Sequence, residues 1–67
     1  MSRPLTDKEY EWMQKIEEVV DRMWDEMTAF EQTFIEDILE RFRKYGSKTF
    51  ISEKQWAIIT RISEKIL

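Results

Sequence analysis

The stretch Met27-Thr28-Ala29-Phe30-Glu31 decides whether the residues before Gly46 form one helix or two. Thr28 and Glu31 have the spacing of a capping box. In that motif the threonine hydroxyl accepts a hydrogen bond from an N–H of the first helical turn, and the glutamate accepts one from the threonine N–H. No apolar staple supports this start, because the polar Gln32 occupies the inner position opposite Met27. The box itself favours a break at Thr28.

Two further capping boxes mark helix starts elsewhere in the chain. They are Thr6-Asp7-Lys8-Glu9 and Ser52-Glu53-Lys54-Gln55. Each is flanked by a pair of apolar residues with the spacing of a hydrophobic staple, which fixes the angle at which the chain enters the helix. These pairs are Leu5 with Tyr10 and Ile51 with Trp56. The sequence therefore predicts three helix starts, each set by local chemistry.

An apolar seam that crosses Thr28 without a slip supports a different fold. Its members alternate by three and four positions, as in a coiled coil. They are Met13, Ile16, Val20, Met23, Met27, Phe30 and Phe34. A single helix of about 39 residues would not bury this face alone and would imply a dimer. Base rates for helix length favour the break at Thr28.

We predict an all-α fold, a three-helix unit that forms one helical domain over residues 1–67. The helices are expected over about Asp7 to Met27, Ala29 to Tyr45 and Glu53 to Leu67, with residues 46–51 as the only loop. Gly46 supplies the left-handed residue that ends the second helix. The second and third helices should form an antiparallel hairpin, with the first packed across them. The side chains expected to face the core are Trp12, Met13, Ile16, Val19, Val20, Met23, Trp24 and Met27, then Phe30, Phe34, Ile35, Ile38, Leu39, Phe42 and Tyr45, then Trp56, Ile59, Ile62 and Ile66.

The composition argues against catalysis. The chain has 67 residues with no Cys and no His, so it lacks the commonest general base, a thiolate nucleophile and the commonest transition-metal ligand. It also has no glycine-rich phosphate loop. We therefore expect no enzyme activity, no cofactor and no metal. No signal peptide or membrane span can be recognised, so we expect a protein of the cytoplasm of a bacterium or of an infected cell.

The net charge of −3 hides a strong asymmetry along the chain. Residues 1–40 hold four basic and twelve acidic side chains, a net charge of −8, whereas residues 41–67 hold seven basic and two acidic ones, a net charge of +5. A basic stripe beside a glycine-containing loop is a candidate contact for phosphates. The alternative is that these cations compensate a helix dipole and solvate an ordinary surface. The candidate nucleic-acid-binding residues are Arg41, Arg43, Lys44, Lys48, Lys54, Arg61 and Lys65.

The acidic half offers a second candidate surface. Its carboxylates are expected on the outer face of the first helix, where they would repel nucleic acid or engage a basic protein. Two tryptophans lie at the edges of the apolar arc of that helix, where an exposed ring would belong to an interface. The alternatives are a plain solvated face and a core filled by large rings. The candidate protein-interface residues are Glu11, Trp12, Glu18, Asp21, Trp24 and Asp25.

Residues 28–67 resemble short helical hairpins found in phage and bacterial nucleic-acid-processing proteins. The first part of the pattern is Thr28-Ala29-Phe30-Glu31-Gln32-Thr33-Phe34-Ile35-Glu36-Asp37-Ile38, with Phe30 where the pattern has Trp. The second part is Ile51-Ser52-Glu53-Lys54-Gln55, followed by Ile59, Ile62 and Lys65. The connector here is longer and more aromatic than in the pattern. The resemblance implies an accessory role near replication, recombination or repair enzymes and a helix start at Thr28. It carries over no catalytic residue.

Three functional hypotheses follow. The first is a non-enzymatic, DNA-binding accessory module for nucleic-acid processing that binds nucleic acid or its processing enzyme, with a phage as a candidate source. The second is an inhibitor or adaptor that binds a basic protein through the acidic helix face. The third is a structural subunit of a homo-oligomeric bundle, motivated by the apolar seam. In each case we expect a homo-oligomer, no membrane contact and no small-molecule substrate.

Overall fold

The computed structural model describes residues 4–67, and within them the fold is all-α, as expected. Three α-helices, α1 (Asp7–Val19), α2 (Ala29–Tyr45) and α3 (Glu53–Ile66), are joined through two short 3₁₀ helices, η1 (Trp24–Glu26) and η2 (Gly46–Lys48). Residues 1–3 lie outside the described part. The expectation that the amino terminus carries no signal peptide falls largely on these residues, and Arg3 is one of them.

All three predicted capping boxes are present, and each α-helix begins where its box predicts. The side chains of Thr6, Thr28 and Ser52 accept from the backbone N–H three positions on, at 3.1 to 3.2 Å. The residue at that position accepts in turn from the backbone N–H of the capping residue, at 2.9 Å in every case. Two backbone N–H groups of each box, which would otherwise have no partner within the helix, are thereby hydrogen-bonded. This fixes the helix starts locally.

The first helix ends at Val19 and not at Met27. Residues 20–23 form turns, η1 follows, and Met27 is extended with φ −104° and ψ 148°. The continuous helix of about 39 residues is therefore wrong, and residues 46–51 are not the only connection. The last turn of α1 contains no basic residue. A helix continued to Met27 would place Asp25 and Glu26 at the negative end of its dipole, which disfavours the extension.

Most of the seam residues that suggested a dimer pack within the one chain. Met13, Ile16, Val20 and Met27 are buried in the same core, Met23 and Phe34 are partly buried against it, and Phe30 is exposed. Because the chain turns after Val19, Met27 returns to this core from a separate segment instead of extending a coiled-coil face. The observation that motivated a structural homo-oligomer therefore has an intramolecular explanation.

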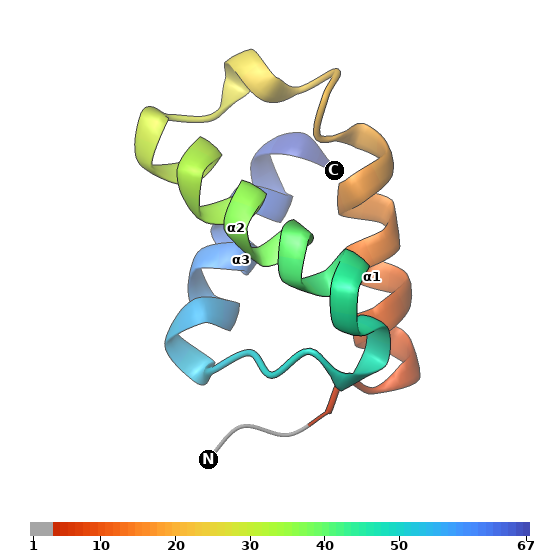
Figure 1. Ribbon diagram of the computed structural model, residues 1–67. Coiled ribbons are helices and arrows are strands. Elements are labelled where there is room, and N and C mark those ends of the chain that lie inside the picture. Colours follow the sequence, from red (N-terminus) through yellow and green to blue (C-terminus); the bar gives the residue numbers. More distant parts are fainter. Residues whose placement is uncertain (1–3) are drawn as a thin grey trace.

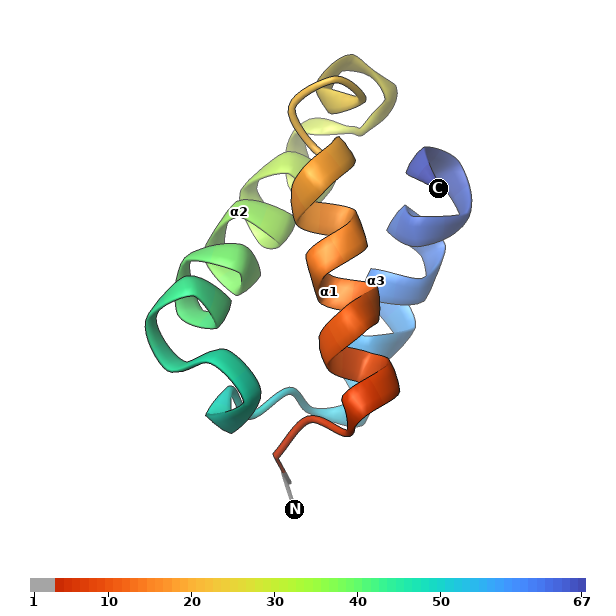
Figure 2. The same ribbon diagram turned by 90° about the vertical axis from the view of Figure 1, so that its right-hand side faces the viewer.

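The helices run up, down and up in Figure 1, so α2 and α3 are antiparallel, as predicted. In Figure 2 α1 lies toward the viewer, with α2 to its left and α3 behind it to the right. Ring contacts fix α1 on both sides. Tyr10 packs on Phe42 of α2 with ring centroids 5.1 Å apart, and Trp12 stacks on Trp56 of α3 at 5.3 Å. The Trp12 indole N–H also donates to the hydroxyl of the buried Ser63 at 2.7 Å.

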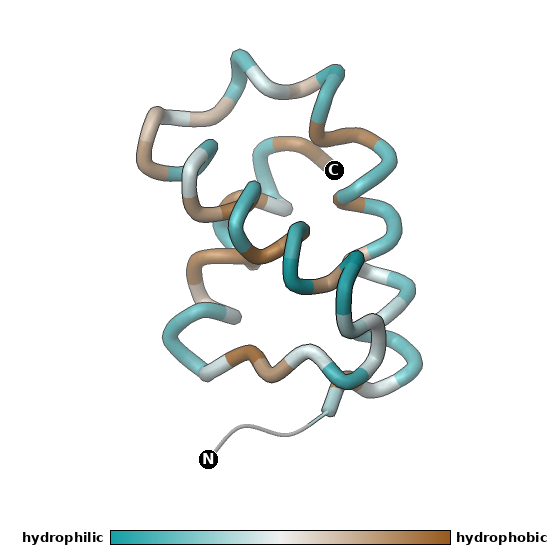
Figure 3. Tube along the Cα trace, in the orientation of Figure 1, coloured by the Kyte–Doolittle hydropathy of each residue, from teal (hydrophilic) through white to brown (hydrophobic). Residues whose placement is uncertain are grey.

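One continuous core fills the space between the helices. Hydrophobic and hydrophilic residues alternate along each helix in Figure 3, as expected for amphipathic helices. The predicted inward face of α2 is wrong at its edges, because Phe30 and Tyr45 are 64% and 53% exposed. Phe34, Trp12, Val19, Met23, Trp24 and Trp56 are only partly buried. The buried apolar residues are Leu5, Met13, Ile16, Val20, Met27, Ile35, Ile38, Leu39, Phe42, Ile51, Ile59, Ile62 and Ile66.

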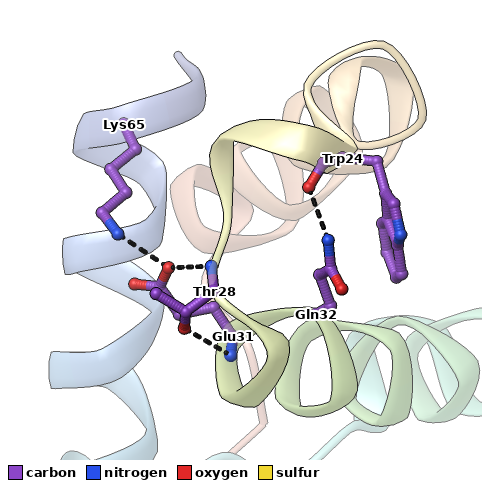
Figure 4. Close-up of polar contacts among 5 residues, drawn as sticks. All are labelled: Trp24, Thr28, Glu31, Gln32 and Lys65. Atoms are coloured by element: carbon purple, nitrogen blue, oxygen red, sulfur yellow. Dashed lines mark hydrogen bonds and ion pairs between the residues drawn. The ribbon is translucent and has the colours of Figure 1, made fainter.

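The start of α2 is tied to the end of α3 by Glu31 (Figure 4). Its carboxylate accepts from the Thr28 backbone N–H at 2.9 Å and from the Lys65 ammonium at 2.7 Å. These donors hold the pKa of Glu31 below its ordinary value of 4.5, with the Lys65 contribution the largest. Beside this contact, the side-chain amide of Gln32 donates to the Trp24 carbonyl at 2.8 Å and holds η1 against α2.

Gly46 ends α2 with a positive φ, as predicted, but not with the left-handed helical conformation. Its φ of 57° and ψ of −130° lie in a region that is open to glycine and closed to L-residues, which carry a Cβ atom. The chain turns there into η2. The amino-terminal segment is bound to this turn, because the Leu5 N–H donates to the Ser47 carbonyl at 2.9 Å.

Replacing Thr28 with alanine removes the hydroxyl that caps α2. We expect Thr28→Ala to lower the free energy of unfolding by about 1 kcal/mol, the usual cost of losing such a cap. Urea denaturation followed by circular dichroism measures the change. Thr33→Ala is the matched control, because Thr33 is exposed inside α2 and alanine is the better helix former there. A Thr28→Ala variant as stable as the wild type would contradict this role of the box.

Glu31→Gln isolates the charge of the contact with Lys65. Gln55 shows that glutamine can complete a capping box in this chain, so the variant keeps the cap and loses the ion pair. Because the pKa of Glu31 is lower in the folded protein, its charge stabilises the fold fully above about pH 4.5 and this contribution is lost as the pH falls through the folded-state pKa. We expect the free energy of unfolding of the wild type to exceed that of the variant by at most about 1 kcal/mol at pH 7. The difference should shrink as the pH falls below about 4.5; a difference that grows on acidification would contradict the assignment.

Candidate functional site

An open cleft lies along the carboxyl-terminal half of α2 and continues over η2. Its volume is about 600 Å³. We call it the basic cleft, since three of the seven predicted phosphate-binding cations line it, namely Arg41, Lys44 and Lys48. The complete lining is Asp37, Glu40, Arg41, Lys44, Tyr45, Lys48, Thr49 and Phe50. Three cations against two carboxylates give the cleft a small positive charge in a protein whose net charge is negative.

The three cations of the basic cleft differ in how they are engaged. The Arg41 guanidinium lies 3.3 Å from the Asp37 carboxylate, in a pair that is at least half exposed on both sides. The Lys44 ammonium lies 5.4 Å from the centroid of the Tyr45 ring, a cation–π distance. Within residues 4–67 neither Lys44 nor Lys48 forms an ion pair. An exposed pair such as Arg41–Asp37 contributes little stability, so Arg41 can exchange its partner at low cost.

Two aromatic rings complete the basic cleft, and the sequence did not predict either of them there. Tyr45 was expected in the core, and Phe50 was assigned only to a loop. Both rings are more than half exposed, at 53% and 55%. The signal for Phe50 was available, because Ile51 was expected to pack as a staple. In extended chain, neighbouring side chains point to opposite sides, so a buried Ile51 directs Phe50 outward.

The other four predicted cations lie elsewhere. Arg43 pairs with Glu17 of α1, and Lys65 pairs with Glu31. Lys54 and Arg61 are exposed on α3 and do not line the basic cleft. The basic stripe predicted from the sequence is therefore divided. Two of its members stabilise the fold, two are solvated, and three form the cleft.

A second cleft of about 630 Å³ gathers part of the predicted protein interface. Asp21, Trp24 and Asp25 line it, and Glu36 of α2 joins them. We call it the acidic cleft. Its remaining lining residues are Val20, Leu39 and Arg43, whose guanidinium is engaged by Glu17. Glu36 was not predicted, because only the fold brings α2 beside residues 20–25.

The remaining members of the predicted protein interface do not reach the acidic cleft. Glu11 and Glu18 are exposed on α1. Trp12 lies between α1 and α3, where its ring stacks on Trp56 and its N–H donates to Ser63. Among residues 4–67 no three Asp or Glu side chains are grouped closely enough to hold a metal ion.

Comparisons with protein-family models, with curated proteins and with solved structures find no match to this chain. The resemblance to helical hairpins of nucleic-acid-processing proteins therefore stays a prediction. In residues 4–67 no helix has both the length and the apolar character that crossing a membrane requires.

Proposed function

We propose that this protein is a non-catalytic binding module that contacts nucleic acid through the basic cleft. The observation that carries the proposal is the convergence of Arg41, Lys44 and Lys48, from α2 and η2, on one open surface. Lysine and arginine are the main protein ligands of phosphate oxygens, and contact with several phosphates supplies most of the affinity of such modules.

The distribution of charge supports contact on one side only. The basic cleft is lined by Asp37, Glu40, Arg41 and Lys44 of α2, whereas Glu36, Leu39 and Arg43, which lie on another edge of the same helix, line the acidic cleft. A polyanion is attracted to the first surface and repelled by the second, which orients it on the protein. Modest affinity is expected from so few cations, with a shallow salt dependence, because the slope of log K against log salt is proportional to the number of phosphate contacts.

The sequence resemblance supports the cellular role. It covers residues 28–67, and this stretch contains the whole lining of the basic cleft. The role we propose is accessory to replication, recombination or repair, with the chain delivering or retaining nucleic acid for an enzyme. No step of the chemistry is assigned to this chain.

Neutralising the two unpaired cations of the basic cleft tests the proposal. We expect Lys44→Gln/Lys48→Gln to lower the affinity for a fluorescein-labelled oligonucleotide about tenfold or more at 50 mM salt. The slope of log K against log salt should become shallower by about 1.4 if the two contacts are to a single strand. Fluorescence anisotropy across a salt series gives both quantities.

The matched control is Lys8→Gln/Lys15→Gln, which removes the same charge from exposed positions on α1. It should leave the affinity and the slope close to those of the wild type. The proposal fails if the wild type binds no oligonucleotide at low salt, if its binding is independent of salt, or if both double variants lose affinity equally.

The acidic cleft supports a second candidate function, the binding of a basic protein. The fold adds Glu36 to the predicted pair Asp21 and Asp25, around the partly buried ring of Trp24. A cleft with three carboxylates and an aromatic ring suits a lysine- or arginine-rich segment. The chain would then act as an adaptor or inhibitor.

Charge reversal tests this second candidate. We expect Asp21→Lys/Asp25→Lys to abolish binding of a lysine-rich peptide, measured by anisotropy at low salt. Glu11→Lys/Glu64→Lys makes the same change in net charge at exposed positions of α1 and α3 that do not line the cleft, and should retain most of the binding. Equal loss in both variants would mean that the peptide responds to net charge and not to the cleft.

A further inference from the structure

Two exposed rings in the basic cleft are not explained by phosphate contact. Tyr45 is the last residue of α2, and Phe50 lies four residues after Gly46. Both line the cleft together with the three cations. Phosphates need only the cations, so half-exposed aromatic rings at the same place indicate a ligand that also presents flat, apolar faces.

The backbone on both sides of Phe50 is held in place, although the ring itself is exposed. Its neighbours Thr49 and Ile51 are 2% and 4% exposed, so the backbone is anchored on both sides of the ring. The Thr49 hydroxyl donates to the Gly46 carbonyl at 2.7 Å, which closes the turn at η2. A ring on anchored backbone loses little conformational entropy when a ligand covers it.

The ring of Tyr45 is held by different means. Its backbone belongs to the last turn of α2, and the ammonium of Lys44 lies over its ring. Lys44 therefore has two roles in the cleft, as a cation for a phosphate and as a partner that positions an aromatic ring. Two exposed rings on well-anchored backbone, beside three cations, form a stacking platform on a positively charged surface, which is the arrangement that binds single-stranded nucleic acid.

A duplex does not fit these rings. Its base faces are stacked inside the helix, and only phosphates, sugars and base edges are accessible in the grooves. The rings would reach base faces only by wedging between base pairs, which costs a few kcal/mol per step. Unpaired bases offer their faces without that cost. We infer that the ligand of the basic cleft is single-stranded nucleic acid, with bases stacked on Tyr45 and Phe50; this inference rests on the proposed function.

Leucine substitutions test the inference, because leucine is apolar but has no flat ring. Anisotropy is measured with a labelled oligo(dT) and with a labelled duplex of similar length. We expect the wild type to bind the single strand more tightly. Tyr45→Leu and Phe50→Leu should each weaken single-strand binding about fivefold or more, with unchanged duplex affinity and an unchanged salt slope. Tyr45→Phe and Phe50→Tyr keep a ring and should bind as the wild type does.

Phe30→Leu is the matched control, since its ring is 64% exposed at the opposite end of α2 and does not line the cleft. It should bind both probes as the wild type does. Thermal melting checks that every variant folds, which is expected because all three rings are more than half exposed.

The inference and the proposed function fail in distinguishable ways. If Lys44→Gln/Lys48→Gln weakens binding and the leucine variants do not, the single-strand inference is overturned and the nucleic-acid proposal stands. Equal affinity of the wild type for the single strand and the duplex would likewise overturn the single-strand inference and leave the nucleic-acid proposal standing. If no oligonucleotide binds but a labelled peptide rich in Glu and Phe does, and the leucine variants release it, both proposals are wrong and the cleft is a protein-docking site.

Discussion

At the start of α2, one carboxylate oxygen of Glu31 accepts two hydrogen bonds, from the backbone N–H of Thr28 and from the ammonium of Lys65. The first bond sets the residue at which α2 begins. The second ties the last turn of α3 to the first turn of α2, the pairing expected of an antiparallel hairpin. The apolar core shared by the three helices supplies most of the packing, and α1 packs on both other helices through Tyr10 and Trp12. The amino-terminal end of α2 thus combines the signal that starts this helix with a contact that joins it to α3.

Helix starts could be predicted from the sequence and the end of α1 could not, because the two kinds of boundary have different causes. A start is specified by a side chain that caps the backbone three residues away, so Thr6, Thr28 and Ser52 are visible in the sequence. The end of α1 has no glycine or proline, and its backbone simply turns after Val19. One signal was nevertheless present. A helix continued to Met27 would place Asp25 and Glu26 in its last turn, at the negative end of the helix dipole.

The burial of rings was less predictable than the burial of aliphatic side chains. The apolar positions of α2 cover roughly 180° of the helix at 100° per residue, which is wider than the face that α1 and α3 cover. Phe30 and Leu39 mark the two edges of this arc, yet Leu39 is buried and Phe30 is exposed. Tyr45 lies within the arc and is exposed as the last residue of α2. Only the packing of the neighbouring helices determines which edge is covered, and the sequence of α2 does not contain that information.

The charge count along the chain also overstated the basic surface, because opposite charges from its two halves meet in the fold. Arg43 pairs with Glu17, and Lys65 with Glu31, so two of the seven cations in the basic half serve the structure. The Glu31 contact lies at the first turn of α2, and Lys44 of the basic cleft lies 13 residues further on, about 20 Å along the helix axis. Sites at that separation with no shared partner contribute nearly additively to measured free energies. The Glu31 contact and the basic cleft can therefore be altered independently. A loss of binding by a variant of the cleft then reflects the cleft itself and not the assembly of the helices.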